Sequence, residues 1–347
     1  MKFIKKTILV LNVLLVIALI LAYLSPYFDP NNFWVFSIFG LFYPVILIVN
    51  LFMVIFWLLI DYKYSFLSLF FVLIGWFHLI GFVNFSGPDK QDSEIKVLSY
   101  NIGFGYPLRI GPKKVREKKR DKLQSFFLSQ KDVDIFCLQE SSLFSRNILS
   151  RCYPDFHKHE VDKRGTFIFS RYPIIRHGEI SFGTTTNSCI WADINLKTDT
   201  VRIYNMHLQS NRVSSDAVDV IDNVNLQEKK TWQGIRGILS KYSSYSKIRA
   251  IQSKKVSDHA AKSLHPTIIC GDGNDPPTSF TYGQICGEYK DSFMEAGSGI
   301  GTTYAGKIPM LRIDYIFVDE DIDVNSFNIL TETFSDHYAI KGGYSIK

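Results

Sequence analysis

The first quarter of the chain is almost entirely apolar, and this feature constrains the fold more than any other. Three apolar stretches, about Thr7–Leu24, Phe33–Ile60 and Phe66–Phe85, follow one another with short breaks and contain no Asp, Glu, Lys or Arg. A bilayer core of about 30 Å requires about 20 apolar residues in a helix. Residues 1–85 are therefore predicted to form a three-span transmembrane anchor.

A cleaved signal peptide is the alternative interpretation of the first stretch, because the stretch begins with lysines and continues as an apolar run. Two more apolar stretches follow at once, and no clear pattern of small residues typical of a cleavage site precedes Ser25. Three spans are therefore favoured over a signal peptide followed by two spans.

Basic residues indicate the orientation of the anchor. Lys2, Lys5 and Lys6 precede the first stretch and Lys63 lies in the second connection, whereas the first connection carries only Asp29. Short loops with Lys and Arg stay in the cytoplasm, so the N-terminus is expected there. Three crossings then place everything after Phe85 outside. We expect a multi-pass protein of the cytoplasmic membrane with an extracytoplasmic domain.

Beyond the anchor, the sequence is typical of a soluble α+β domain. Residues 86–96 are polar with Gly and Pro, as in a linker, and residues 97–347 alternate apolar runs with helical and polar segments. Many strands with interspersed helices favour two packed sheets with helices outside. The predicted strands are Ile95–Tyr100, Asp134–Leu138, Thr166–Ser170, Ser188–Asn195, Val201–Met206, Thr267–Cys270, Arg312–Val318 and Tyr338–Gly342, and the predicted helical regions are Lys113–Gln130 and about 214–263.

Charge and cysteine content argue against some functions. The formal net charge of +6 is a mild excess, whereas nucleic-acid-binding domains usually concentrate basic residues on one face. None of the five cysteines forms a CxxC pair, so a zinc site is not expected. We favour five free thiols. The alternative is that Cys152 pairs with Cys286 in an oxidising compartment.

Polar residues stand at the ends of several apolar strands, where sites are usually built because loops begin there. Asn101 follows LSY, Glu140 follows IFCLQ and His207 follows IYNM. A carboxylate directly after a buried strand is a typical ligand of a hard cation such as Mg²⁺. Taken singly, each residue has a structural alternative, namely a turn asparagine, a helix-capping glutamate and a core histidine.

The strongest local signal is the apolar strand TIIC followed by GDGND. Asp272 and Asn274 stand at i and i+2 and can face one site, and the glycines allow a ligand to approach closely. A calcium loop of the EF-hand type is excluded because further carboxylates and a terminal Glu are missing. Asp336 and His337 suggest a metal carboxylate beside a general base, and Asp314 can orient His337.

Together, these segments resemble the endonuclease/exonuclease/phosphatase superfamily, the DNase I-like proteins, in content and order. The resemblance extends from about Ile95 to Lys347 and rests on LSYNI, LQE, GTFIFSRYPI, YNMHL, GDGND, RIDYIFV and SDHYAI. It implies a four-layer α/β/β/α sandwich, phosphoester hydrolysis and a divalent cation, usually Mg²⁺, with Mn²⁺ or Ca²⁺ as alternatives.

The resemblance also implies where the cation and the substrate bind. Glu140 would be the main metal ligand, and Asn101 and Asp336 would complete the metal environment. Asn101, together with His207 and Asn274, is expected to contact the substrate.

Catalytic roles follow from the same resemblance. Asp272 and Asn274 would orient the attacking water and stabilise the transition state. His337, paired with Asp314, would be the base or a phosphate contact, and His207 would contact the scissile phosphate and assist the leaving group. Whether Asp272 or His337 takes the proton from water stays open.

One position departs from the family pattern. Gly273 stands between Asp272 and Asn274, where the family usually has a bulky residue. The polar pair is intact, so the chemistry is expected to survive with a more flexible loop.

The sequence leaves the substrate open. Basic residues in 113–122 and 229–255 favour a nuclease, although a solvated helix face explains them better. The anchor favours a lipid or small phosphoester as substrate, because it holds the domain at the bilayer. A catalytically silent binding module is disfavoured by the complete polar set. The expected partners are a phosphoester, with nucleic acid as one option, and the lipid bilayer; no protein partner is indicated.

Overall fold

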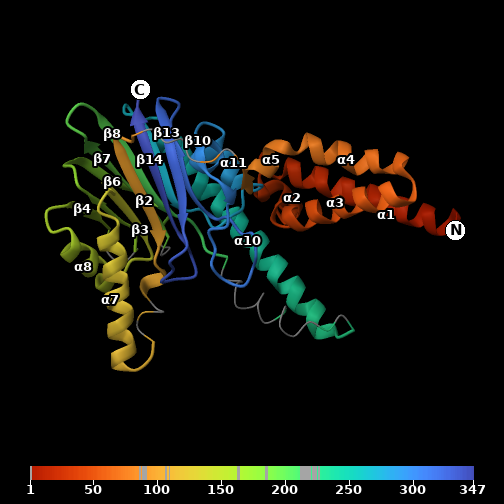
Figure 1. The fold of residues 1–347 in the computed structure, drawn as a ribbon, viewed down its shortest axis with the longest axis horizontal. Coiled ribbons are helices and arrows are strands. Elements are labelled where there is room, and N and C mark those ends of the chain that lie inside the picture. The colour runs from red at the N-terminus through yellow and green to blue at the C-terminus, as the bar shows by residue number, and fades with distance from the viewer. Residues whose placement is uncertain are drawn as a thin grey trace. The chain divides into compact units, whose positions relative to one another are not determined.

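Two compact units make up the chain in the computed structural model (Figure 1). The structure describes residues 2–85, 87, 92–105, 108, 110–161, 165–183, 187–211, 220, 225 and 227–347. The first unit comprises residues 1–82, 211–250 and 275–284, and the second comprises residues 83–210, 251–274 and 285–347. The predicted linker, residues 86–96, lies partly outside the described residues.

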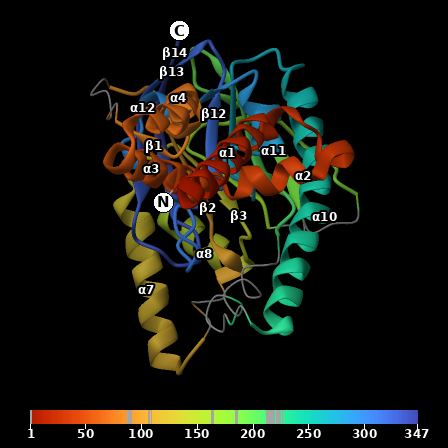
Figure 2. The ribbon, with the colours of Figure 1, turned by 90° about the vertical axis from the view of Figure 1, so that its right-hand side faces the viewer.

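Helices of the first unit follow the apolar stretches. They are α1 (Lys2–Leu24), α2 (Pro30–Leu41), α3 (Tyr43–Ile60), α4 (Ser65–Ile74) and α5 (Trp76–Ile80), with 3₁₀ turns at Ser25–Tyr27 and Tyr62–Tyr64. Asp29 caps α2 by accepting a hydrogen bond from the backbone N–H of Asn31 at 2.8 Å. Helices α1, α3 and α4 pack side by side (Figure 2).

Two helical stretches of the described residues, Phe3–Tyr27 and Tyr43–Ile60, are long and apolar enough to cross a membrane. The prediction of three spans is wrong for the third, which breaks at Gly75 and leaves α4 with 10 residues. Such a helix rises about 15 Å, half of a bilayer core. The break coincides with Tyr23, whose hydroxyl would lie 1.9 Å from a Cβ on Gly75 and donates to the Phe71 carbonyl at 3.0 Å. The second predicted stretch, Phe33–Ile60, also breaks, at Phe42, and only its later part, Tyr43–Ile60, is long enough to cross.

Three buried polar side chains join α1, α3 and α4. Ser68 Oγ donates to Asn12 Oδ1 at 2.7 Å and to Asn50 Oδ1 at 3.3 Å. Asn50 Nδ2 donates to the carbonyl of Leu15 at 3.2 Å. Interhelical hydrogen bonds of this kind fix the packing of apolar helices. The apolar sequence therefore forms one packed group of helices.

A buried ion pair ties the segment after GDGN to α10 (Lys229–Ala260). Arg249 Nη2 donates to Asp275 Oδ1 at 2.6 Å, and the two residues are 0% and 2% exposed. Tyr242 and Thr281 donate to the same carboxylate at 2.9 and 2.7 Å. This carboxylate accordingly organises the non-apolar part of the first unit.

Two six-stranded sheets form the second unit. Their orders are β10-β12-β9-β8-β7-β6 and β13-β14-β2-β3-β5-β4, with parallel pairing of β2 with β3 and of β8 with β9. The strands are β1 (Val83–Asn84), β2 (Ile95–Asn101), β3 (Ile135–Gln139), β4 (His157–Glu160), β5 (Phe167–Ser170), β6 (Ile174–Ile180), β7 (Ser188–Asn195), β8 (Thr200–His207), β9 (Thr267–Asp272), β10 (Lys290–Asp291), β11 (Gly299–Ile300), β12 (Asp314–Val318), β13 (Ile322–Leu330) and β14 (Ala339–Ile346). The other helices are α7 (Lys113–Ser129), α8 (Leu143–Cys152), α11 (Phe280–Cys286) and α12 (Ser292–Ala296), with a 3₁₀ turn at Gly103–Gly105.

Alternation along the strands creates the layers. On β2, Val97 faces the apolar core between the sheets, whereas Leu98 packs with Phe127 of α7 on the outer face. On the other sheet, the hydroxyl of Tyr204 is hydrogen-bonded to Nδ1 of His259, near the end of α10, at 2.8 Å. Helices therefore cover both outer faces, in the predicted α/β/β/α order (Figure 1).

The predicted strands recur with boundaries shifted by no more than four residues, but β4, β6 and β13, and the two-residue strands β1, β10 and β11, were not predicted. The first three are edge strands. Edge strands are partly exposed, so they lack the continuous apolar run that identifies a central strand. The region 214–263 contains α10, and its earlier part lies largely outside the described residues. All five cysteines, each of them described, are free.

The buried ion pair predicts a large stability effect. Replacement of Arg249 by Met leaves the Asp275 carboxylate buried without its cation, so we expect a loss of about 3–5 kcal/mol of folding free energy. The measurement is thermal unfolding of the full chain in detergent micelles. Lys254→Met is the control, because the Lys254–Asp258 pair on the same helix is exposed and its loss costs under about 1 kcal/mol. Equal shifts for the two variants would contradict the prediction.

Candidate active site

Strand pairing brings the predicted polar residues to one edge of the two sheets. Asn101 lies on β2 opposite the last residue of β3, and Glu140 follows β3 directly. In the other sheet, Asp272 pairs with His207 on one side and with Asp314 on the other. Parallel strands end at the same edge of a sheet, so residues far apart in sequence meet there.

A hydrogen bond between side chains joins the two sheets inside this site. Asn101 Nδ2 donates to Asp272 Oδ2 at 2.8 Å, and each residue is 1% exposed. Asp272 Oδ1 accepts from the backbone N–H of Asn274 at 2.8 Å. Asn274 has a left-handed φ of 54°, which asparagine tolerates better than most residues. Asp272 and Asn274 of GDGND are thus held together.

Burial controls the acidity of Asp272. It raises the pKa of Asp272 to about 6, while His337 opposes the rise and Asp314 adds to it. A carboxylate with such a pKa is largely ionised at neutral pH and can still accept a proton. Asp272 is therefore suited to general-base chemistry.

Gly273 is fixed by its surroundings. Its N–H donates to the carbonyl of Ile313 at 2.8 Å. A Cβ at this position would lie 3.2 Å from the ring of Tyr315, so that ring fills the space beside the glycine. These two contacts restrict the freedom that a glycine would otherwise give the loop.

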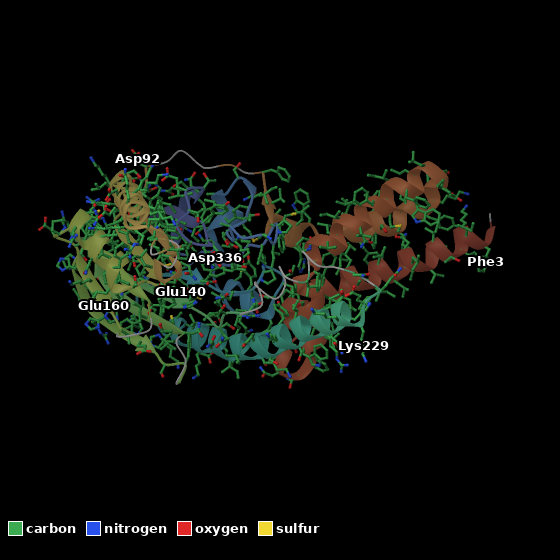
Figure 3. The ribbon with its side chains drawn as sticks, turned by 90° about the horizontal axis from the view of Figure 1, so that it is seen from below. Phe3, Asp92, Glu140, Glu160, Lys229 and Asp336 are labelled. Atoms are coloured by element: carbon green, nitrogen blue, oxygen red, sulfur yellow. The ribbon has the colours of Figure 1, made fainter. Side chains whose placement is uncertain are left out.

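Glu140 has an unusual backbone conformation at the end of β3. Its φ is 47°, a left-handed value that is strained for a residue with a side chain. Gly165 makes this possible, since a Cβ there would lie 3.0 Å from the Glu140 Cα. Burial raises the pKa of Glu140, with His337 opposing and Asp336 adding to the rise. Figure 3 labels Glu140 and Asp336, whose carboxylates interact electrostatically.

His207 is buried beside two carboxylates, yet its hydrogen bonds are unfilled. Nε2 lies 3.4 Å from Glu140 Oε1 and 3.9 Å from Asp272 Oδ2. Among the described residues, none forms a hydrogen bond with either ring nitrogen. Burial lowers the pKa of His207, with Asp272 opposing. A buried polar group without a partner costs about 1–3 kcal/mol, so this imidazole is suited to a ligand.

His337 is held by an acid on its inner side. Its Nδ1 lies 2.9 Å from Asp314 Oδ2, and its Nε2 lies 3.8 Å from Asp272 Oδ2. Burial lowers the pKa of His337, but the charges of Asp314 and Asp272 outweigh burial and raise it to about 10. The imidazole is therefore protonated at neutral pH, and its Nε2–H can donate towards the site.

A loop at the start of β14 completes the site. Ser335 Oγ donates to the carbonyl of Asn101 at 2.6 Å, which holds residues 333–337 against β2. Asp336 is exposed at the rim, whereas the next residue, His337, is buried. Alternation along this loop thus places one carboxylate at the opening and one imidazole inside.

Two sets of residues could hold a cation. Asp272, Asp314 and His337 offer ligand atoms within 4.8 Å of one another, but the His337–Asp314 hydrogen bond already explains that closeness. The predicted set is Glu140 with Asn101 and Asp336, and the Asn101 side chain and the Asp336 carboxylate both interact with the Glu140 carboxylate. It offers two carboxylates and an amide oxygen next to an opening, and Mg²⁺ prefers one or two carboxylates while keeping sites for water and phosphate.

Three buried residues that support the site, Gln139, Asn205 and Thr303, were not singled out from the sequence. Gln139 Nε2 donates to Asn205 Oδ1 at 2.7 Å, so β3 is linked to β8 one position before Glu140 and two before His207. Thr303 Oγ1 accepts from the backbone N–H groups of Ile313 and Asp314 at 2.9 and 3.0 Å. For Gln139 and Asn205, the available signal in the sequence was a polar residue inside an otherwise apolar strand. Thr303 lies in a loop, where the sequence gives no such signal.

Comparisons with known proteins agree with this geometry. Residues 98–337 match the family model described as the endonuclease/exonuclease/phosphatase family, and residues 5–82 match a domain of unknown function (DUF8431). No curated protein matches the sequence.

Solved structures with a similar fold include the mannosyl-6-phosphatase Bt3783 of Bacteroides thetaiotaomicron, with 17% identity over 73% of this chain and 100% of that chain and a TM-score of 0.53. TDP2 of D. rerio, solved with a single-strand DNA product, has 15% identity over 72% and 98% of the two chains and a TM-score of 0.53. An endonuclease/exonuclease/phosphatase family protein of Bacteroides thetaiotaomicron has 16% identity over 73% and 98% and the same TM-score of 0.53.

At these identities the solved structures establish the fold alone, whereas the family match covers more than half of the chain. The protein belongs to the endonuclease/exonuclease/phosphatase family.

Proposed function

We propose that this protein is a metal-dependent phosphoester hydrolase held at the membrane by its N-terminal helices. The observation that carries the proposal is the buried His207, whose ring nitrogens lack a partner among the described residues while Glu140 and Asp272 lie within 4 Å. A phosphoryl oxygen supplies the acceptor that this imidazole lacks. An acidic wall alone would repel a phosphate, so the site also needs a cation.

Glu140, Asn101 and Asp336 would hold that cation, with Mg²⁺ the best match and Mn²⁺ or Ca²⁺ as substitutes. When bound, Mg²⁺ supplies positive charge that polarises a phosphoryl oxygen. The exposed position of Asp336 and the 24% exposure of the Glu140 side chain leave room for substrate and water on the open side.

The side chains of this chain divide the remaining work. Asp272 takes the proton from the attacking water, because its pKa of about 6 keeps it ionised at neutral pH. Asn274 orients that water. His337, protonated and braced by Asp314, donates to the phosphoryl oxygens. His207 contacts the phosphate and assists the leaving oxygen. Such preorganised donors stabilise the transition-state charge.

The membrane part of the proposal rests on the first unit. The Lys5–Asp61 ion pair places the N-terminus beside the connection between α3 and α4. Ser37 and Gly40 of α2, after the first connection, instead accept hydrogen bonds from Ser246 and Thr278, which belong to segments that continue into the catalytic unit. With the lysines cytoplasmic, the catalytic unit is extracytoplasmic. Helices α4 and α5, of 10 and 5 residues, connect α3 to the second unit.

A nuclease is the second candidate function. Its supporting observation is α7, where seven Lys and Arg residues and two acids lie among residues 113–122, nearly all of them exposed. Exposed cations on one helix attract any polyanion. A catalytically silent binding module is not supported, because a binding site alone would not need a strained glutamate, a braced histidine and a paired Asp–Asn loop together.

Neutralising Glu140 should remove most activity. Glu140→Gln keeps the shape of the side chain but weakens its affinity for the cation, so we expect kcat/KM for bis(4-nitrophenyl) phosphate to fall by about 10²–10⁴-fold. Glu288→Gln, the same change at an exposed position, should change nothing. Comparable rates for wild type and Glu140→Gln, with both variants folded, would remove the metal assignment.

Metal binding can be measured without turnover. A ligand that binds only the folded state stabilises it and so raises the Tm. When the free ligand concentration is a hundred times the Kd, the stabilisation is about 2.7 kcal/mol. We expect MgCl₂ to raise the Tm of the chelator-treated chain and of Glu288→Gln, but not that of Glu140→Gln. An equal rise in Tm for the wild type, Glu288→Gln and Glu140→Gln would show that the cation does not bind at Glu140. In a separate assay, EDTA should abolish hydrolysis by the wild type.

The activity should fall on the acid side as Asp272 is protonated. The pKa of Asp272 in the folded protein is raised to about 6. The carboxylate is therefore ionised and able to act as a base above that pH, and it becomes protonated below it. A bound cation lowers carboxylate pKa values, so kcat/KM should have its acid limb at or below about 6. A limb above pH 7, with saturating Mg²⁺, would exclude Asp272 as the base.

A further inference from the structure

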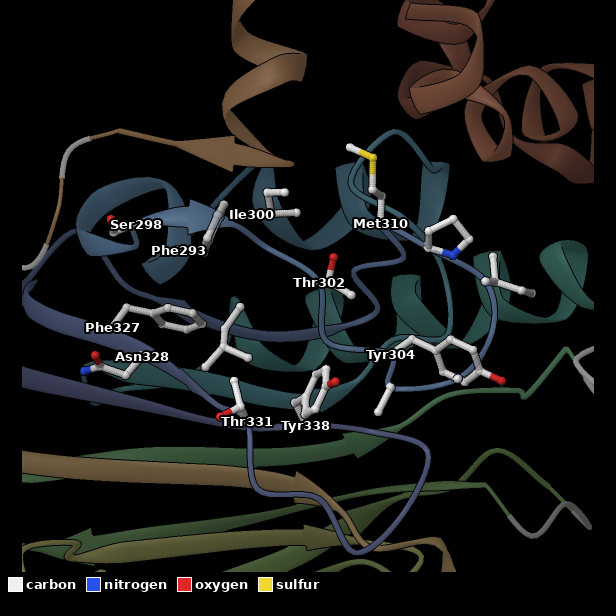
Figure 4. A pocket seen from close by; sticks show the side chains of 15 residues that line it. Phe293, Ser298, Ile300, Thr302, Tyr304, Met310, Phe327, Asn328, Thr331 and Tyr338 are labelled. Atoms are coloured by element: carbon white, nitrogen blue, oxygen red, sulfur yellow. The ribbon is translucent and has the colours of Figure 1, made fainter. Parts of the chain in front are cut away.

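An apolar cleft of about 660 Å³ lies in the second unit beside the loop of residues 333–337 (Figure 4). One wall comes from β13 and the residues that follow it, including Phe327 and Thr331, and the other comes from residues 298–310, including Ile300 and Met310. The volume lies within the range of about 300–1,000 Å³ that is usual for small-molecule sites.

Charge determines what this cleft can hold. None of the described residues that line it is Lys, Arg, Asp or Glu, and most are aliphatic or aromatic. A phosphate or a polyanion backbone would find no cation here, whereas an uncharged apolar group gains free energy by leaving water. The cleft therefore suits the apolar part of a ligand.

The cleft adjoins the proposed phosphate site. Tyr304, one of its lining residues, lies edge to face with His337 at 5.9 Å between ring centroids. Ala305 also lines it and donates its N–H to the carbonyl of Asp336 at 2.7 Å. Tyr338, a third lining residue, follows His337 in the chain. A ligand with its phosphate at His337 would thus reach the cleft with its adjoining atoms.

The rim of the cleft is tied to the end of the apolar helices. Val83 and Asn84 of β1 pair with Ile300 and Gly299 of β11. Asn84 Nδ2 also donates to the carbonyl of Phe293, another lining residue, at 2.7 Å. β1 begins three residues after α5 ends, and three residues span at most about 11 Å.

Exposed apolar side chains mark the same rim. Phe85, directly after β1, is 75% exposed, and Ile300 is 58% exposed. Aromatic and aliphatic side chains beside a membrane helix favour the interface between lipid and water. Both residues would be costly to leave in water alone, and their position at the rim fits contact with a bilayer.

From these observations we propose that the cleft binds the apolar tail of a membrane phosphodiester lipid, whose phosphate enters the His207–His337 site. The inference rests on the proposed hydrolase function and names its substrate class. In the reaction, a water oxygen bonds to phosphorus, the bond from phosphorus to one ester oxygen breaks, and that oxygen takes a proton. The products are a phosphomonoester and an alcohol.

The test compares a lipid with its own headgroup. The full chain in detergent with Mg²⁺ is assayed on glycerophosphoglycerol and on phosphatidylglycerols of increasing acyl length. We expect kcat/KM to rise with chain length, by up to about fourfold for each methylene that enters the cleft. The Ile300→Glu variant places a charge at the rim, so the ratio of kcat/KM for long-chain over deacylated substrate should fall about tenfold or more.

Ile175→Glu is the matched control, because Ile175 lies on the edge strand β6 and is 52% exposed; it should leave the ratio unchanged. Hydrolysis of the deacylated diester without any dependence on chain length would overturn the lipid inference and leave the hydrolase proposal standing. A higher kcat/KM for a single-stranded oligonucleotide than for every lipid would also overturn the lipid inference and leave the hydrolase proposal standing. No hydrolysis of any phosphodiester by the wild type would overturn the proposed function itself.

Discussion

The active site depends on two hydrogen bonds that cross between the sheets. Asn101 on β2 donates to Asp272 on β9, and Gln139 on β3 donates to Asn205 on β8. Face-to-face sheets normally meet through apolar side chains about 10 Å apart, and such a core sets spacing without fixing lateral position. Buried amide and carboxylate groups are directional and costly to leave unpaired. At this edge they fix the lateral position of one sheet on the other.

That fixed position explains why the charges can be arranged as they are. Asp272 is placed among His207, His337 and Asp314, and burial pushes its pKa up to about 6 while it pushes that of His207 down. His337 differs from His207 because Asp314 sits directly on its Nδ1. The two histidines of this pocket therefore differ in protonation at neutral pH: His207 is neutral and has no hydrogen-bond partner among the described residues, whereas His337 is charged and held by Asp314. Environment, rather than residue type, assigns the roles.

The sequence predicted that the polar residues of the second unit gather at one edge of the sheets, but it predicted one apolar helix of the first unit wrongly. Strand ends are recognisable because an apolar run stops at a polar residue, as at Asn101, Glu140 and His207, and parallel pairing then collects them. The break at Gly75 depends on Tyr23, which lies on α1, far from Gly75 in the sequence. A hydropathy pattern, which reads only neighbouring residues, could therefore not predict the break. The edge strands β4 and β6 were not predicted for a related reason. The burial of their side chains depends on the strands and helices around them, and not on the alternation of apolar residues in their own sequence.

The GDGND segment shows how one short motif serves two structural roles. Asn274 belongs to the catalytic unit and bonds to Asp272, whereas Asp275 belongs to the first unit and pairs with Arg249. One peptide bond separates Asn274, for which we propose a role in orienting water, from Asp275, whose carboxylate accepts hydrogen bonds from Tyr242, Arg249 and Thr281. Asn274 has a left-handed backbone that must be held from both sides. Gly273 before it donates its N–H to the carbonyl of Ile313, and Asp275 after it is held by its ion pair with Arg249, so hydrogen bonds fix the residues on both sides of Asn274.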